Sequence, residues 1–130
     1  MKIVVGYRGK DTEKALLELA VKHAKAFDGI VFLITSMRGG KEVESEEFAR
    51  AEEKLEKGKV FLEKNGVKNE THLIVEGLAP GEDLVNYSKK INADVIFIGA
   101  KSRSKVRKLL FGSTTQYVIL EASCPVLYVK

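Results

Sequence analysis

The sequence predicts an α/β fold: one domain in which a five-stranded parallel sheet is covered by helices on both faces. Short apolar runs rich in β-branched residues alternate with longer segments of helical spacing, and this order is typical of parallel strands joined by helical crossovers. The chain has 130 residues with no linker, repeat or low-complexity tract, a length that suits one hydrophobic core.

The first strand is predicted over residues 3–7, a nearly continuous apolar run typical of a strand buried on both faces. Asp11 or Thr12 can cap the helix that follows. Residues 28–29, Asp-Gly, end that helix, and residues 30–34 form a second continuous strand. The apolar stripe of the helix consists of Leu16, Leu17, Ala20, Val21, Ala24 and Phe27.

The long charged segment over residues 44–64 predicts a second helix, in which Gly58 is an unfavourable residue. Residues 65–66, Asn-Gly, end this helix, and residues 71–75 form the third strand. The apolar positions that recur at helical spacing in the charged segment are Phe48, Ala51, Leu55 and Leu62.

A third helix is predicted to begin at Pro80, because proline suits the first position of a helix. Glu82 and Asp83 follow at once, and their attraction to the helix dipole explains them without acid–base chemistry. Residues 95–98 form the fourth strand and residues 126–129 the fifth. The packing residues expected in the third helix and in a short helix at 114–121 are Leu84, Val85, Tyr87 or Ser88, Ile91, Tyr117, Val118, Ile119 and Leu120.

The segment from Asp94 to Thr114 is predicted to form a strand, a phosphate-cradling loop and the start of a helix. A phosphate needs convergent N–H donors, and small side chains leave room for it. Ser113 and Thr114 follow Gly112 at the helix start, where free N–H groups and the dipole favour an anion. The segment matches neither the Walker A motif nor the dinucleotide-binding pattern. The small residues in it include Gly99, Ala100, Ser102, Gly112 and Ser113.

The spacing of these residues resembles a known signature. Gly99, two residues, Ser102, nine residues and then Gly112-Ser113-Thr114 are similar to the G-x2-G-x9-G-[ST] signature of the universal stress protein family. The resemblance spans the whole chain and is most specific from residue 77 onward. Other matching segments are Gly77-x-x-Pro80, residues 91–99, residues 123–129, Lys2-Ile3-Val4-Val5 and Lys14-Ala15-Leu16.

The resemblance implies a Rossmann-like sheet of the adenine nucleotide alpha hydrolase-like type, in strand order 3-2-1-4-5. It further implies a homodimer paired through the last strand, Val126–Val129, and binding of ATP or AMP, with magnesium accompanying a triphosphate. The apolar edge strand itself also favours pairing. The adenine is expected near Gly6, Tyr7, Ser36 and Met37. The complete set expected to bind nucleotide is Gly6, Tyr7, Arg8, Ser36, Met37, Gly99, Ser102, Arg103, Gly112, Ser113 and Thr114.

Two residues depart from the family pattern. Ser102 stands where nucleotide-binding members carry a second glycine, and Arg8 occupies the turn where members usually place an aspartate that contacts the nucleotide. Loss of that acceptor would weaken nucleoside recognition by roughly 1.5–3 kcal/mol. Alternatively, Arg8 meets a phosphate, or Asp11 substitutes for the aspartate from the next turn.

Composition excludes several other functions. The net charge of +4 is too small to indicate nucleic acid binding, and the basic cluster over residues 101–108 lacks interleaved aromatic side chains. Cys124, His23 and His72 are interpreted as packed or exposed residues, so neither a zinc site nor an activated thiol is expected. No run approaches the ~18 apolar residues of a membrane span, and residues 1–7 do not form a signal peptide. A cytoplasmic location is therefore expected.

Three functional hypotheses follow. The first is a cytoplasmic dimeric module that binds adenine nucleotide and acts in stress response or signalling. The second is an interaction module of the same family that has lost nucleotide binding, as Arg8 and Ser102 suggest. The third is a slow ATP hydrolase, for which the sequence offers no evident general base. No catalytic residue is predicted.

Overall fold

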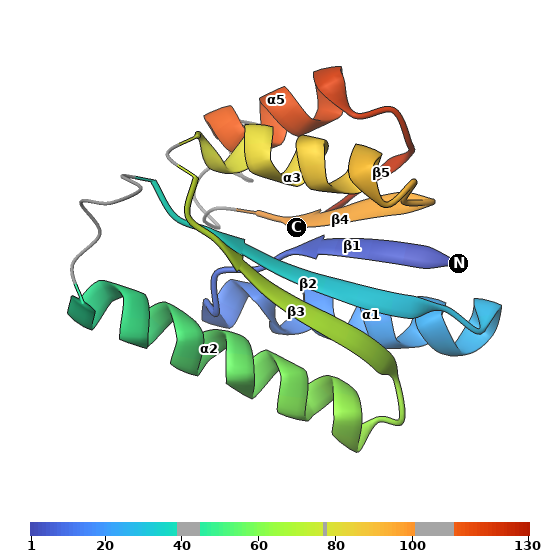
Figure 1. Ribbon diagram of the computed structural model, residues 1–130. Coiled ribbons are helices and arrows are strands. Elements are labelled where there is room, and N and C mark those ends of the chain that lie inside the picture. The colour runs from blue at the N-terminus through green and yellow to red at the C-terminus, as the bar shows by residue number, and fades with distance from the viewer. Residues whose placement is uncertain (39–44, 77, 101–110) are drawn as a thin grey trace.

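The computed structural model describes residues 1–38, 45–76, 78–100 and 111–130 (Figure 1). Its elements alternate along the chain as the hydrophobic pattern predicts. They are β1 (Lys2–Gly6), the 3-10 turn η1 (Asp11–Glu13), α1 (Lys14–Phe27), β2 (Ile30–Ser36), α2 (Ser45–Lys64), β3 (Lys68–Ile74), α3 (Pro80–Lys90), β4 (Val95–Gly99), α5 (Ser113–Glu121) and β5 (Val126–Val129).

The five strands form one parallel sheet in the order β3-β2-β1-β4-β5, which confirms the predicted fold class and strand order. Helices α1 and α2 lie against one face, and α3 and α5 against the other (Figure 1). The central strand β1 pairs with β2 on one side and β4 on the other, so that Ile3 lies between Val31 and Val95. The order of strands therefore reverses at β1.

Two apolar layers hold the helices to the sheet. Successive side chains of a strand point to opposite faces, so Ile3 and Val5 pack toward α1 and α2, whereas Val4 packs toward α3 and α5. All three are fully buried. Burial on both faces explains why the sequence of β1 is almost continuously apolar.

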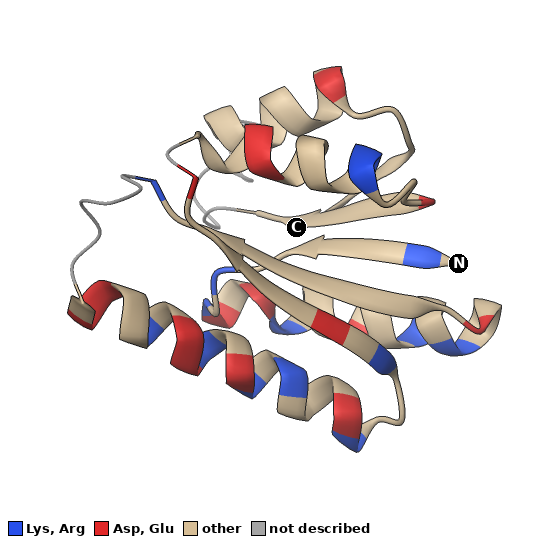
Figure 2. Cartoon of the chain, in the orientation of Figure 1, with Lys and Arg blue, Asp and Glu red and all other residues tan. Residues whose placement is uncertain are grey.

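Gly58 does not interrupt α2. A Cβ at this position would lie 2.7 Å from Leu33 Cδ2 and 3.0 Å from Tyr7 Cε2, so the glycine lets the helix approach the sheet closely. Glycine lowers the stability of a helix by about 1 kcal/mol relative to alanine, and the close packing of α2 on the sheet offsets this loss. Elsewhere α2 alternates acidic and basic side chains on its exposed surface (Figure 2).

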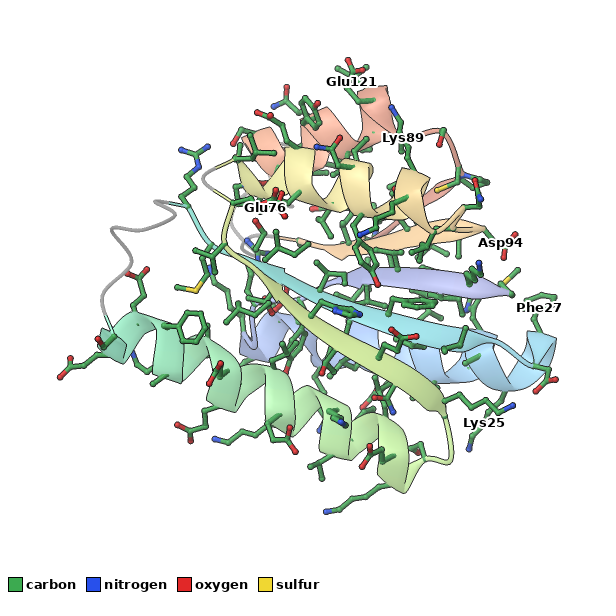
Figure 3. All side chains as sticks on the ribbon, in the orientation of Figure 1. Lys25, Phe27, Glu76, Lys89, Asp94 and Glu121 are labelled. Carbon is green, nitrogen blue, oxygen red and sulfur yellow. The ribbon has the colours of Figure 1, made fainter. Side chains whose placement is uncertain are left out.

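Three predicted apolar faces differ in the structure. In α2, Phe48 is 38% exposed. Phe27, expected in the stripe of α1, is 56% exposed and projects at the end of the helix (Figure 3). In α5 only Val118 is fully buried, whereas Tyr117 and Ile119 are partly exposed and Leu120 is 78% exposed. The cause is position, because α5 packs on α3 near an edge of the sheet and has a partner on one side only.

Polar residues extend β3 beyond its predicted start. The strand begins at Lys68 because its register with β2 continues from Ile30 opposite Lys68 to Ser36 opposite Ile74. The prediction for the start of α1 was also wrong, since neither Asp11 nor Thr12 caps it and Glu13 occupies the N-cap position. In the described part of the chain, no helix has both the length and the apolar character needed to cross a membrane.

Candidate functional site

A pocket lies at the carboxyl ends of the strands, where the strand order reverses. Ligands of open parallel α/β sheets bind at such a point, because the connections on either side run to opposite faces. The cavity has a volume of about 150 Å³. We call it the strand-end pocket; its lining consists of Gly6, Tyr7, Arg8, Ile34, Ser36, Pro80, Leu84, Ile98, Gly99, Gly112, Ser113, Thr114 and Thr115.

One part of the strand-end pocket is apolar. Ile34 and Ile98 contribute side chains from β2 and β4, and Leu84 contributes one from α3. Gly6 lies between them in β1, and a Cβ there would come within 2.8 Å of Leu84 Cδ1. The glycine therefore leaves room for the leucine, and the resulting surface suits a flat, weakly polar group.

The amino end of α5 forms the polar part of the pocket. Gly112 is the N-cap in extended conformation, and its carbonyl accepts the first helical bond from the Gln116 N–H at 3.0 Å. The N–H groups of Ser113, Thr114 and Thr115 precede that first bond, and no side chain of Gly112 is available to cap them. With the hydroxyls of Ser113 and Thr114 beside them, these groups form a suitable anion site.

The turn after β1 is fixed by a buried acid. Glu13 is only 1% exposed, and its Oε1 accepts the backbone N–H groups of Arg8 at 2.8 Å and Lys10 at 3.1 Å. Its Oε2 lies 3.3 Å from Arg8 Nε. Burial and, secondarily, the Glu13 carboxylate raise the pKa of Tyr7, which therefore stays neutral. Glu13 thus fixes the backbone of the turn at Arg8 and Lys10 and holds the Arg8 side chain at the pocket.

A second buried acid, in α3, lies next to the end of β2. Asp83, in the first turn of α3, is 2% exposed and accepts a short hydrogen bond from the hydroxyl of Ser36. Burial raises the pKa of Asp83, the Ser36 bond lowers it, and the nearby carboxylates of Glu76 and Glu82 raise it further. Figure 3 shows Glu76 at the end of β3, beside the start of α3. Attraction to the helix dipole alone does not account for an acid in this setting.

The structure brings most of the predicted site residues together. Eight of the eleven line the strand-end pocket: Gly6, Tyr7, Arg8, Ser36, Gly99, Gly112, Ser113 and Thr114. Met37 is buried and its N–H bonds Ile74 O at 2.9 Å, but it is not part of the lining. Ser102 and Arg103, with the rest of the predicted phosphate loop, lie outside the described residues.

Gly99 does not act as the sequence suggested. Its hypothetical Cβ would point toward α1, at 3.5 Å from Leu16 Cδ2 and 3.6 Å from Glu13 Cγ. Those are ordinary contact distances on the face of the sheet opposite the pocket. The backbone of Gly99 lines the pocket, but the space that a ligand needs does not depend on its lack of a side chain.

Sequence reasoning missed Glu13 as a functional residue and attributed Asp83 to the helix dipole. A signal for Glu13 was present, because a glutamate three residues after a helix-entry position commonly reaches back to that residue's N–H. Asp11, considered as the acid of this turn, is exposed. For Asp83 the only signal was its place beside the buried pair Leu84 and Val85.

Comparison with known proteins identifies similar sequences and structures. The model of the universal stress protein family matches residues 1–130. A universal stress protein of Methanocaldococcus jannaschii is 33% identical, over 99% of this chain and 81% of that protein.

Solved structures of the same family are also similar. A universal stress protein of Archaeoglobus fulgidus has 33% identity and a TM-score of 0.89, covering 100% of this chain and 93% of its own. Another structure from that organism, in complex with dAMP, has 30% identity and a TM-score of 0.86, covering 100% and 98%.

Proposed function

The chain belongs to the universal stress protein family, and from that premise we propose that it is a dimeric module that binds ATP or AMP and acts in stress response or signalling. The proposed setting is the cytoplasm. Bound nucleotide would alter the surface around the strand-end pocket, and that change would be the signal to a partner.

The observation that carries this proposal is the division of the pocket into an apolar and an anion-binding part. Ser36 ends β2, and Gly112 begins the helix that follows β4. Since β1 separates these two strands, they lie about 9–10 Å apart. A nucleotide has a comparable separation between its base and its phosphates. We assign the base to the side of β2 and the phosphates to α5, with a triphosphate accompanied by magnesium.

A relative supports the class of ligand. The Archaeoglobus fulgidus protein in complex with dAMP shares 30% of its sequence with this chain over the full length. Its ligand is an adenine nucleotide, which contains both a flat base and a phosphate. The two parts of the strand-end pocket match those two groups.

Arg8 has a defined role in the proposal. Its Nε lies beside the buried Glu13, while its side chain remains 39% exposed at the pocket. A guanidinium has five N–H donors in a planar fork, so one ion pair leaves others for phosphate oxygens. We therefore propose that Arg8 contacts phosphate, and that Glu13 holds it in place.

Binding is favoured over hydrolysis. Among the described lining residues there is no carboxylate and no histidine to serve as a general base toward a bound triphosphate. Asp83 is behind Ser36, on the side assigned to the base. We accordingly propose no catalytic residue.

Isothermal titration with ATP and magnesium, and separately with AMP, tests the proposal. We expect saturable binding to the wild-type protein. Thr114→Val removes a hydroxyl but keeps the shape of the side chain. It should lower the affinity for ATP about 10-fold, because a hydrogen bond to a charged group is lost. Adenosine, which has no phosphate, should bind both proteins equally.

Two outcomes would contradict this assignment. Absence of heat at high micromolar nucleotide, together with no nucleotide released from the purified protein on denaturation, would favour the interaction module without nucleotide. If Thr114→Val lowered the affinities for adenosine and ATP equally, the phosphates would have to bind elsewhere in the pocket.

A further inference from the structure

The hydroxyl of Ser36 donates its proton in a fixed direction, toward Asp83. Ile34 and Ser36 are two residues apart on β2 and therefore share the face of the sheet that carries α3. There the Ser36 hydroxyl donates to Asp83 Oδ2, and Asp83 is almost completely buried. Ser36 lines the strand-end pocket, whereas Asp83 does not. The carboxylate thus acts on the pocket only through the serine.

This bond decides what Ser36 offers to a ligand. A hydroxyl has one proton and two lone pairs, and an ionised carboxylate can only accept. Because the proton of Ser36 is directed to Asp83, the hydroxyl presents lone pairs to the pocket. A ligand donor that faces the Ser36 oxygen gains a hydrogen bond. A ligand acceptor in the same place faces another acceptor, so it gives up its hydrogen bond to water and gains none in return.

We propose that Asp83, through Ser36, makes the strand-end pocket selective for a base that presents a hydrogen-bond donor at position 6, and hence for 6-amino over 6-oxo purines. The inference rests on the proposed function, which assigns the base to the side of β2. Asp83 is a positioning residue in this scheme, and Ser36 is the residue that touches the ligand. The pocket would bind adenine nucleotides and discriminate against those of hypoxanthine.

The apolar neighbours of Ser36 strengthen this selection. Ile34, Leu84 and Ile98 surround the base position and offer no alternative partner to an unmatched carbonyl. Desolvation of a polar group without a partner costs more than a typical hydrogen bond contributes. The discrimination therefore depends on the one hydroxyl whose direction the buried carboxylate determines.

The experiment compares ATP, ITP and the triphosphate of purine riboside by isothermal titration under the same conditions. We expect the wild-type protein to bind ATP about 10- to 100-fold more tightly than ITP. This is the difference expected when one ligand forms a hydrogen bond and the other places an acceptor against an acceptor. The purine riboside triphosphate lacks both 6-substituents and should fall between them. The ligands differ only at position 6 and, in ITP, by the proton on N1, so the ratios are independent of phosphate binding.

Two variants test the proposed chain of contacts. Ser36→Ala should reduce the ATP to ITP ratio to below about 3-fold, because the discriminating hydrogen bond is lost. Asp83→Leu frees the Ser36 hydroxyl to donate, and should improve ITP binding relative to ATP. Circular dichroism checks that both are folded. Thr114→Val serves as the matched control, since it should weaken both ligands by the same factor and leave the ratio unchanged.

The possible failures are distinguishable. Equal affinity of the wild-type protein for ATP and ITP would overturn this inference and leave the proposed nucleotide binding intact. No binding of any of the three ligands would overturn both. If Ser36→Ala weakened ATP and ITP equally, the discrimination would lie with another group, and the role assigned to Asp83 would be wrong.

Discussion

Glu13 and Asp83 are buried carboxylates, and each holds a residue that lines the strand-end pocket. Burial of a charge is unfavourable unless hydrogen bonds compensate it. Glu13 has two backbone N–H donors and a guanidinium, so its burial is well compensated. Asp83 has the hydroxyl of Ser36 and lies near two other acids. The two carboxylates should therefore affect stability differently.

Asp83→Asn is predicted to stabilise the protein at neutral pH. The folded state raises the pKa of Asp83 above its ordinary value, chiefly through burial, so between these two values the folded protein binds more protons than the unfolded chain. Stability then falls as the pH rises through this window. The amide carries no charge, and its oxygen can still accept from Ser36. We expect a gain of about 0.5–2 kcal/mol at pH 7, measured by urea unfolding.

The pH dependence separates this explanation from others. The advantage of Asp83→Asn should shrink as the pH is lowered, and it should be smallest below the ordinary pKa of aspartate, where the wild-type carboxyl is protonated in both states. Glu46→Gln is the control, because Glu46 is an exposed acid in the first turn of α2 and reports the dipole contribution alone. An advantage that grew on acidification would mean that the fold favours the charged form.

The sequence predicted the individual residues of the site better than their contacts. Ser113 and Thr114 could be placed at a helix start because that placement depends on local spacing after Gly112. The bond between Ser36 and Asp83 joins residues 47 positions apart, and no local pattern encodes it. Met37 was wrongly expected in the pocket for a similar reason. Which side chain faces the pocket depends on the residue at which β2 ends, and the sequence does not show that residue.

At the scale of elements, the strands were predictable because both faces of a parallel sheet are buried. Three runs, in β1, β2 and β4, are apolar along most of their length. The first half of β3 is polar and became a strand only through its register with β2. The exposed face of α5 could not be foreseen either, because helical spacing does not reveal how many neighbours a helix has.

Gly58→Ala tests how closely α2 must approach the sheet. Alanine improves helix propensity by about 1 kcal/mol, but its Cβ would overlap the buried Leu33, at 2.7 Å from Cδ2. Overpacking of this kind costs about 1–3 kcal/mol, so we expect a net loss on the order of 1 kcal/mol in chemical unfolding. The Tyr7 ring would also be displaced, which should weaken nucleotide binding.

The control for Gly58→Ala is Glu56→Ala, two residues earlier on the exposed side of the same helix. This variant should unfold within about 0.5 kcal/mol of the wild type, as is usual for surface substitutions. A clear stabilisation by Gly58→Ala would mean that α2 can move away from Leu33 without cost. The glycine would then have no packing role.

At the scale of the whole molecule, β5 is an outermost strand of the sheet in the part of the chain that the structure describes, and α5 carries little charge. Glu121 is the only charged residue of α5, and β5 carries none (Figure 2). Leu120 and Ile119 of α5 are exposed. Interfaces are depleted of charge and enriched in apolar side chains, and an unpaired apolar edge invites another strand. These features are the basis for placing the proposed dimer interface here.

The backbone of β5 allows a specific test of that interface. The carbonyl of Pro125 accepts from Ile96 N of β4 at 3.0 Å, and that of Val129 accepts from Ala100 N, just after β4, at 2.8 Å. The alternation of a parallel ladder therefore directs the N–H of Val126 outward. Val126→Pro removes that donor at the first residue of an edge strand, where proline is tolerated, and should convert a dimer into a monomer in light scattering at micromolar concentration. Val126→Thr keeps the donor and should remain dimeric. A folded Val126→Pro protein of dimeric mass would show that the subunits associate through a surface other than β5.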